Sequence, residues 1–274
     1  MPVLMLMLLL GILACGSAPE SPKAQSIKPI ESLATKVDSP IVEVDSMEIE
    51  TIAIEKLLGK ISPAKDSDFV PIAQKYTTKT GIFLQREAYE AFEKMHAAAA
   101  VDGVKLVILS AMRTFNDQKG IWENKWSGRT LVGGKNLSTA VQDPAERAKA
   151  ILRYSSMPGS SRHHWGTDMD LNSLENGFFD TGSGKKAYEW LQAHAAEYGF
   201  CQPYSAMGAD RPNGYQEERW HWSYMPIAAR YLRAYRAQVK LADINGFLGS
   251  ETATPLNVIE HYVSGIAPPC RDWK

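Results

Sequence analysis

Residues 161–170 read SRHHWGTDMD, and a second short stretch, ERWH, follows at residues 218–221. The first offers an imidazole, His163, and a carboxylate, Asp170, seven residues apart. The second offers another imidazole, His221, with a glutamate three residues before it. Two histidines, one aspartate and a further glutamate are the parts of a hydrolytic zinc site. In such a site three side chains hold the metal, a fourth position stays open for water, and a free carboxylate takes the proton of that water.

The chain must bend between His163 and Asp170 if both are to hold one metal ion. On a strand their odd separation puts them on opposite faces, and on a helix they lie roughly 10 Å apart along the axis. Gly166 is the expected bend because glycine adopts positive φ without strain. Glu218 and His221 need only one helical turn or a kinked strand end to point the same way.

The remaining histidines and one aspartate compete for the same role. His164 adjoins His163, and Asp168 lies two residues before Asp170, so either could replace its neighbour as a ligand. Spacing alone leaves both choices open. Three more histidines lie away from any ligand pattern, and we interpret them as ordinary structural residues: His96, His194 and His261.

The pattern Ser-x-His-x-x-Gly-x-x-x-Asp, followed by Glu-x-x-His, resembles the signature of the VanY-type D-alanyl-D-alanine carboxypeptidases, zinc peptidases of bacterial cell walls. The resemblance implies that zinc is held by His163, Asp170 and His221, with Glu218 as the catalytic base. It covers about residues 70–230.

Two further segments support the resemblance. LSAMRTFNDQ at residues 109–118 resembles the family segment Ser-x-x-Arg-Ser/Thr-x-x-x-Gln, whose arginine falls on Arg113. We expect this guanidinium to neutralise either the oxyanion of the reaction or the free carboxylate of a terminal D-amino acid, and we prefer it as the reader of that carboxylate. Departures at Arg219 and Asp168 are expected to affect substrate preference more than metal binding. Weaker candidates for peptide contacts are Gln118, Ser161 and Tyr204.

Apolar spacing and capping residues predict a mixed fold. Asp143, as helix N-cap before Pro144, and the turn before the aliphatic run KLVILS are the clearest local signals. The fold class is α+β, with a small antiparallel β-sheet that carries the zinc site and helices around it. The resemblance implies the same fold, which lysostaphin-type peptidases and hedgehog share. The predicted helices span residues 52–59, 86–99, 114–126, 143–154, 184–198 and 226–241, and the predicted strands span residues 105–110, 167–171 and 220–224.

Residues 1–15 form an apolar run that is too short to span a bilayer. Its end, ILAC, resembles a bacterial lipobox, so we expect a lipoprotein signal peptide and lipidation of Cys15. Gly and Ser follow that cysteine, and the absence of Asp there favours the periplasmic face of the outer membrane. An uncleaved signal anchor is the alternative.

Composition predicts the domain boundaries of the rest of the chain and excludes some classes of partner. Residues 16–48 lack a sustained apolar period and predict a flexible tether, which leaves residues 49–274 as one zinc peptidase domain. The oxidising compartment implied by export favours a disulfide between Cys201 and Cys270, with two free thiols as the alternative. A net charge of −1 and the lack of a P-loop or dinucleotide motif give no support to a nucleic-acid or nucleotide partner.

The expected reaction is removal of a C-terminal D-alanine from peptidoglycan stem peptides, with Glu218 as general base and then general acid. A peptidoglycan endopeptidase with the same zinc chemistry is one alternative. A metal-containing wall-binding module without turnover is another, and it would not need Glu218. The expected partners are therefore stem peptides and, through the lipid anchor, a membrane.

Overall fold

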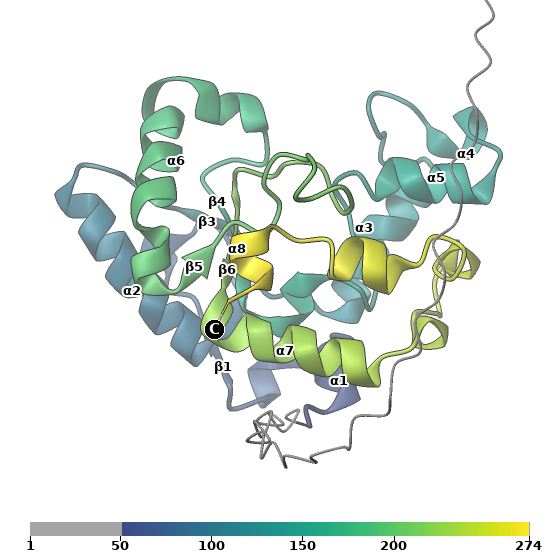
Figure 1. Ribbon diagram of the computed structural model, residues 1–274, viewed down its shortest axis with the longest axis horizontal. Coiled ribbons are helices and arrows are strands. Elements are labelled where there is room, and N and C mark those ends of the chain that lie inside the picture. Colours follow the sequence, from purple (N-terminus) through teal and green to yellow (C-terminus); the bar gives the residue numbers. More distant parts are fainter. Residues whose placement is uncertain (1–50, 274) are drawn as a thin grey trace, which may run out of the picture. The chain divides into compact units, whose positions relative to one another are not determined.

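The computed structural model describes residues 51–273 of the chain. The predicted signal peptide at residues 1–15, its Cys15 and the tether at residues 16–48 lie outside the described residues. Within the described range, no helix is both long and apolar enough to cross a membrane. A small antiparallel sheet lies at the centre with helices around it (Figure 1), which confirms the predicted α+β class.

The central sheet has four strands in the order β3, β4, β6, β5, and every neighbouring pair is antiparallel. In the β4–β6 pair, Asp170 lies opposite His221 and Asp168 lies opposite Ser223. Because side chains alternate along a strand, these four polar residues share one face. The strands are β3 (Ile108–Ser110), β4 (Asp168–Leu171), β5 (Phe200–Cys201) and β6 (His221–Tyr224), and a separate hairpin pairs β1 (Phe69–Pro71) with β2 (Phe83–Gln85).

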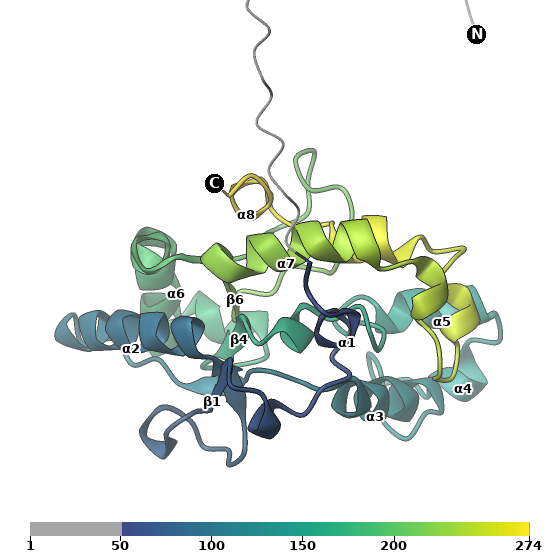
Figure 2. The same cartoon turned by 90° about the horizontal axis from the view of Figure 1, so that it is seen from below.

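The opposite face of the same sheet is apolar. Met169, Leu171 and Trp222 are buried there in one hydrophobic cluster with residues of α2 (Arg86–Val101) and α6 (Gly182–His194). Figures 1 and 2 both show α2 and α6 together at one end of the molecule. The sheet therefore separates a polar, site-bearing face from a conventional core.

Three of the remaining helices lie at the other end of the molecule, as both views show (Figure 2). A second hydrophobic cluster, which includes Trp122, Trp165 and Tyr235, holds them together. α7 (Met225–Gln238) follows β6 directly, so the strand that carries His221 is continuous with a core helix. The helices at this end are α3 (Phe115–Trp126), α4 (Leu137–Ala140) and α5 (Pro144–Ile151), and the shorter α1 (Ile54–Leu57) and α8 (Pro268–Arg271) complete the set.

Local capping fixes where α3 and α5 begin, as the sequence predicts for α5. The Asp143 side chain accepts a hydrogen bond from the Glu146 backbone N–H at 2.8 Å, with Pro144 in the first turn. Before α3, Thr114 and Asp117 form a reciprocal capping box. Such a cap is worth about 1 kcal/mol, and here it also sets the position of the residue just before it, Arg113.

Some element boundaries differ from the predictions. β3 begins only at Ile108, three residues after the predicted start at residue 105. The last predicted helix stops at Gln238, because a separate 3₁₀ turn follows in which the Asp243 carboxylate accepts from the Lys240 N–H. Capping by a downstream carboxylate thus ends a helix that apolar spacing alone would have continued.

A disulfide joins Cys201 on the edge strand β5 to Cys270 on α8. The two cysteines are 69 residues apart in sequence. In the chain-entropy description a crosslink of this length stabilises the folded state by roughly 4 kcal/mol. The bond therefore holds the C-terminal segment against the sheet.

Candidate metal centre

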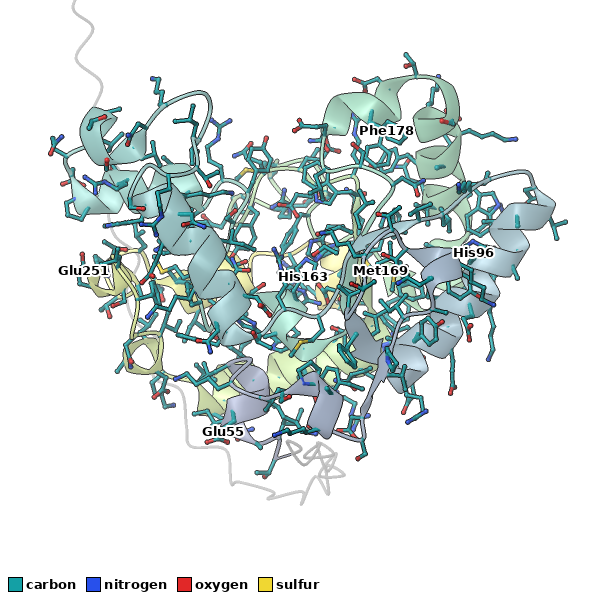
Figure 3. All side chains as sticks on the ribbon, turned by 180° about the vertical axis from the view of Figure 1, so that it is seen from behind. Glu55, His96, His163, Met169, Phe178 and Glu251 are labelled. Carbon is teal, nitrogen blue, oxygen red and sulfur yellow. A yellow bond between two sulfur atoms is a disulfide. The ribbon has the colours of Figure 1, made fainter. Side chains whose placement is uncertain are left out.

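Three buried side chains converge on the polar face of the sheet. Potential ligand atoms of His163, Asp170 and His221 all lie within 4.8 Å of one another. His163 Nε2 is 3.4 Å from Asp170 Oδ1, and His221 Nδ1 is 3.4 Å from the same oxygen. Figure 3 shows His163 near the middle of the molecule. The structure thus brings together all three residues that the sequence assigns as ligands.

The bend expected between His163 and Asp170 is at Gly166. His163 lies on a 3₁₀ turn, Arg162–Trp165, and Gly166 ends this turn with φ 68° before β4 starts. A Cβ atom at Gly166 would also lie 2.3 Å from the Phe69 ring. Glycine is therefore required both for its backbone conformation and for space.

Backbone contact fixes which nitrogen of His163 faces the cluster. His163 Nδ1 is 2.7 Å from the Ala111 carbonyl oxygen. Because a carbonyl only accepts, Nδ1 carries the proton and Nε2 keeps its lone pair. Metal-binding histidines are commonly oriented by this kind of bond from the other ring nitrogen.

The Asp168 carboxylate orients the His221 ring in the same way. His221 Nε2 is 2.8 Å from Asp168 Oδ2, so this nitrogen donates and Nδ1 is left facing the cluster. Burial lowers the pKa of His221, but the bonds to Asp168 and Glu218 outweigh it and raise the pKa to about 9. Asp168 therefore acts on the ligand, although the sequence predicted that its departure from the family pattern would affect substrate preference.

Asp168 itself is fully bonded and unavailable to a metal. It accepts from Arg162 Nε at 3.0 Å, Ser223 Oγ at 2.7 Å and Thr167 Oγ1 at 2.7 Å, in addition to His221. Neither Arg162 nor Asp168 has any exposed side-chain surface. Burial raises the pKa of Asp168, but Arg162 and His221 more than compensate and hold it well below its usual range.

His164 is also excluded as a ligand by its contacts. Its Nε2 accepts from the Gly159 backbone N–H at 2.9 Å, and its Nδ1 lies 2.7 Å from the Arg113 carbonyl oxygen. Burial lowers the pKa of His164 to about 3, so it stays neutral. The structure therefore resolves both alternatives in favour of His163 and Asp170.

The donor set fits a divalent metal, and zinc in particular. Asp170 Oδ1 is buried without a hydrogen-bond partner among the described residues, and His163 Nε2 and His221 Nδ1 each lie 3.4 Å from it. Burial raises the pKa of Asp170, but the neighbouring His163 and His221 lower it to about 2, so it is ionised. Two imidazoles and one carboxylate are the common protein ligands of catalytic zinc. Such an orphaned buried oxygen is explained if it binds a cation.

Glu218 lies against the cluster in a position to exchange protons. Its Oε2 is 3.1 Å from His221 Nδ1, and its backbone N–H donates to the Tyr204 carbonyl at 2.9 Å. Burial raises the pKa of Glu218, and His221 only partly offsets this. A carboxyl group with a raised pKa is suited to acid–base work near neutral pH.

Arg113 adds a guanidinium cation that acts on the same cluster. Its backbone N–H donates to the His163 carbonyl at 3.1 Å, which ties the residue to the ligand turn. Among the described residues its guanidinium has no carboxylate partner, and its Nε is buried without a hydrogen bond. After burial itself, the charge of Arg113 is the largest influence that lowers the pKa of His163.

The three candidate peptide contacts differ in how available they are. The Gln118 side chain is fully buried and donates to the Ser156 carbonyl at 2.7 Å, so it braces a loop beside the site. Ser161 Oγ is buried without a partner in the described part of the chain. Tyr204 packs edge-on against His221, with 4.7 Å between ring centroids. Ser161 Oγ and the side-chain oxygen of Gln118, Oε1, are therefore the polar atoms that lack a partner among the described residues.

Arg219 and the remaining histidines lie away from the metal cluster. Arg219 is partly exposed and forms ion pairs with Asp180 at 2.6 Å and with Glu217 at 3.4 Å, and its effect on substrate preference stays a prediction. The histidines interpreted as structural lie outside the metal cluster: His96, His194 and His261.

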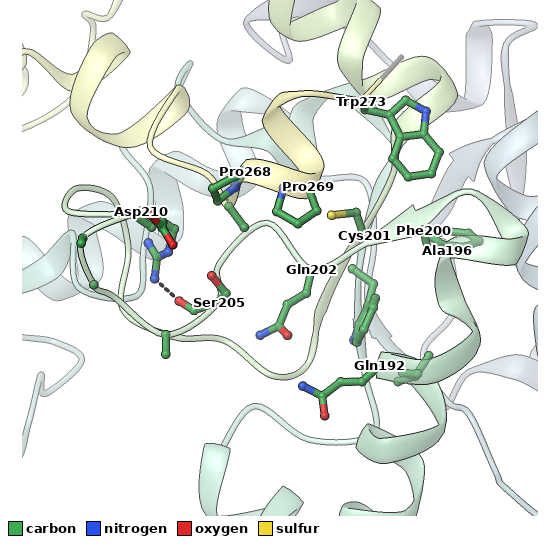
Figure 4. A pocket seen from close by; sticks show the side chains of 17 residues that line it. Gln192, Ala196, Phe200, Cys201, Gln202, Ser205, Asp210, Pro268, Pro269 and Trp273 are labelled. Carbon is green, nitrogen blue, oxygen red and sulfur yellow. Dashed lines mark hydrogen bonds between the residues drawn. The ribbon is translucent and has the colours of Figure 1, made fainter.

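A large pocket lies beside the disulfide rather than at the metal cluster (Figure 4). Its volume is about 670 Å³, and Cys201, Gln202 and Trp273 are among its lining residues. It also includes Trp222, which neighbours His221 in β6 and lies on the apolar face of the sheet. The cavity is therefore separate from the metal ligands.

This chain is similar in sequence to a known protein family and to two curated proteins. A sequence model of the family "VanY: D-alanyl-D-alanine carboxypeptidase" matches residues 81–227. YodJ of Bacillus subtilis (strain 168), whose name provisionally assigns it as a carboxypeptidase, is 32% identical over 149 residues, which are 52% of this chain and 46% of YodJ. An uncharacterized protein of Haemophilus influenzae is 34% identical over 84 residues, which are 30% of this chain and 58% of that protein. The chain thus spans about half the length of the curated relatives it matches.

Solved structures with similar folds include two peptidases. The LdcB LD-carboxypeptidase has a TM-score of 0.47 and 22% identity, covering 74% of this chain and 81% of its own. VanYB in complex with D-alanine-D-alanine has a TM-score of 0.44 and 23% identity, covering 65% of this chain and 87% of its own. The family match spans more than half of this chain and includes the three ligand positions together with Arg113 and Glu218. The chain therefore belongs to the VanY family of D-alanyl-D-alanine carboxypeptidases.

Proposed function

We propose that this protein is a zinc-dependent carboxypeptidase that removes the C-terminal D-alanine of peptidoglycan stem peptides. The observation that carries the proposal is the buried Glu218, whose carboxylate lies 3.1 Å from His221 Nδ1, the nitrogen that faces Asp170 and His163. A site that only held a metal ion would not need Glu218, a second carboxylate that is not one of the three ligands. Membership of the VanY family supports the same reaction and the same substrate class.

The residues of the site divide the work of peptide hydrolysis. A zinc ion held by His163, Asp170 and His221 would polarise the scissile carbonyl and acidify a bound water. Glu218 accepts the proton of the attacking water and then delivers it to the leaving amine, which becomes a neutral leaving group. The Arg113 guanidinium stabilises the negative charge that develops on the carbonyl oxygen.

The orientation of His221 is part of this machinery. Asp168 accepts from His221 Nε2 and so keeps Nδ1 directed at the cluster. Arg162 and Ser223 hold Asp168 in turn, at 3.0 Å and 2.7 Å. The ligand geometry is therefore preorganised by a network that no substrate needs to form.

The first prediction tests catalysis against simple binding with Glu218→Gln, which keeps the shape of the side chain but cannot accept a proton. Hydrolysis of stem peptides that end in D-alanine is expected to fall by a factor of about 10² to 10⁴, with zinc content unchanged. Product mass spectrometry and metal analysis measure the two quantities. Glu217→Gln is the matched control, because Glu217 pairs with Arg219 and does not belong to the metal cluster. Wild type and Glu218→Gln with the same low activity on every stem peptide would instead favour the wall-binding module.

We also propose that the protein acts in the cell envelope, lipidated at Cys15. The disulfide between Cys201 and Cys270 supports an oxidising compartment, and peptidoglycan is built outside the cytoplasmic membrane. Fractionation of cells that express the full chain tests this, and recovery in the cytoplasm with reduced cysteines would contradict it.

A further inference from the structure

We propose that Lys125 is a second cationic position in the site and binds the free α-carboxylate of the substrate's terminal residue, while Arg113 serves the scissile carbonyl. This inference rests on the proposed carboxypeptidase function and names the group that reads the chain end. It reassigns a role that the sequence alone led us to expect for Arg113.

The face of α3 that bears Lys125 lies on the loop leading to the metal ligands. Gln118 and Lys125 are seven residues apart, two helical turns, so they share one face of this helix. The Gln118 amide donates to the Ser156 carbonyl at 2.7 Å, and Lys125 Nζ donates to Ser155 Oγ at 2.5 Å. The same loop continues to Ser161 and the turn that carries His163.

Lys125 lacks a counter-ion although it is only partly exposed. In the described part of the chain no carboxylate lies within 4.0 Å of its ammonium, and among these residues the ammonium is hydrogen-bonded only to the Ser155 hydroxyl. Lys56, which is partly buried as well, pairs with Asp66 at 2.9 Å, and the exposed Lys149 pairs with Glu146 at 2.7 Å. A sheltered ammonium whose protein partner is a neutral hydroxyl is suited to pair with an anionic ligand.

The hydrogen bond to Ser155 places Lys125 against the loop that leads to the ligand turn. Its pKa responds to the charges there: burial lowers it, the positive charge of Arg113 lowers it further, and the negative charge of Glu218 raises it. Two cations without carboxylate partners beside one catalytic carboxylate form a site for an anion.

The two cations differ in how they are tied to the metal ligands, which assigns their roles. The Arg113 backbone is bonded directly to the ligand His163, at 3.1 Å, whereas Lys125 is bonded to Ser155, eight residues before that ligand. Arg113 is therefore the inner cation. The terminal carboxylate lies one residue, roughly 3.5 Å, beyond the scissile carbonyl, so it needs a cation farther out.

The second prediction is that Lys125→Met impairs recognition of the chain end selectively. For synthetic peptides that end in D-alanine, kcat/KM should fall about 10- to 100-fold, mainly through KM, as for loss of one hydrogen bond to a charged group. The same peptides with an amidated C-terminus should be cleaved equally by wild type and variant. Lys125→Arg should restore much of the preference for the acid, and Lys149→Met is the surface control.

A purely structural role for Lys125 predicts a different result. If the residue only braces Ser155, Lys125→Met lowers kcat/KM on the acid and the amide peptides alike, and that outcome overturns the inference. Unchanged kcat/KM on the acid peptide overturns it as well.

A binding measurement separates this inference from the proposed reaction. In zinc-loaded Glu218→Gln protein, calorimetry with the acid peptide should give tighter binding than with the amide peptide, and adding Lys125→Met should abolish the difference. If that holds while the wild type hydrolyses no stem peptide, the reaction fails and the carboxylate site stands. If the wild type is active but the double variant still prefers the acid, the reaction stands and Lys125 is not the reader.

Discussion

Asp168 and Asp170 lie two residues apart on the same buried face of β4, yet their surroundings are opposite. Asp168 accepts hydrogen bonds from four side chains, including that of Arg162. Asp170 faces two imidazole nitrogens at 3.4 Å, and its Oδ1 has no hydrogen-bond partner in the described structure. Burial is the same for both, so the contrast shows that saturation of hydrogen bonds separates a structural carboxylate from a metal ligand.

The neighbouring histidines repeat this contrast. His164 uses both ring nitrogens on backbone groups, of Gly159 and Arg113. His163 uses only Nδ1, on the Ala111 carbonyl, and leaves Nε2 facing Asp170. In each pair, the residue with an unused lone pair belongs to the metal centre.

The largest expected effect comes from removing each of the two carboxylates, Asp168 and Asp170, in turn. Asp168→Ala leaves the Arg162 charge buried and unpaired, which should lower the free energy of unfolding by about 3–5 kcal/mol. It should also weaken zinc binding by a factor of about 10–100 through loss of the His221 contact. Asp170→Asn should lower zinc far below one ion per chain while leaving the stability of the metal-free protein nearly unchanged. Urea unfolding with a chelator and metal analysis measure these effects.

A double variant tests whether the stability loss comes from the stranded charge. Arg162→Met combined with Asp168→Ala should be more stable than Asp168→Ala alone, because the unpaired buried cation is gone. Equal zinc loss and equal destabilisation in the two single aspartate variants would break the distinction between them.

An effect of similar size is expected from the histidine pair. His163→Ala should abolish zinc binding, whereas His164→Ala should retain one zinc per chain and lose about 1–3 kcal/mol for each buried backbone group left without its partner. Metal content and thermal unfolding of the purified variants decide the matter. Zinc retained in His163→Ala and lost in His164→Ala would move the ligand by one residue.

The smallest effect on stability is expected at Asp66, a partly exposed carboxylate that pairs with Lys56 and can be compared with the two buried aspartates. Burial raises its pKa, but hydrogen bonds from Lys56 and from the Asp68 backbone outweigh this and lower it below 3.8. A carboxylate whose pKa is lower in the folded than in the unfolded state stabilises the fold at pH values above its unfolded-state pKa. This stabilisation is lost as the pH falls through its folded-state pKa. Asp66→Asn should therefore cost at most about 1 kcal/mol at pH 7.

The same linkage sets the control for Asp66. In metal-free protein the difference between wild type and Asp66→Asn should shrink as the pH of the urea titration is lowered below 3.8, where the carboxylate of wild type becomes protonated. A constant difference across this range would show that the loss comes from packing or backbone effects, and not from ionisation.

Much of the site could be predicted because its chemistry is carried by residue type and order. Two histidines, an aspartate and a glutamate at family spacing indicate the ligands and the base, and the α5 cap follows from local signals at Asp143. Gly166 was predictable for a geometric reason, since two ligands seven residues apart require a bend. These features depend on the chain within a few residues, or on a pattern that separated motifs share.

The tertiary structure alone decided which groups are saturated and which are free. Sequence spacing could not separate Asp168 from Asp170, because the difference lies in Arg162 and in Ser223 on another strand. Nor could it place Lys125 against the loop that leads to the metal ligands, because that contact depends on how α3 packs on the loop at residue 155. Hydrogen-bond saturation and unpaired charge are properties of the surroundings in space, and a residue's neighbours along the chain do not determine them.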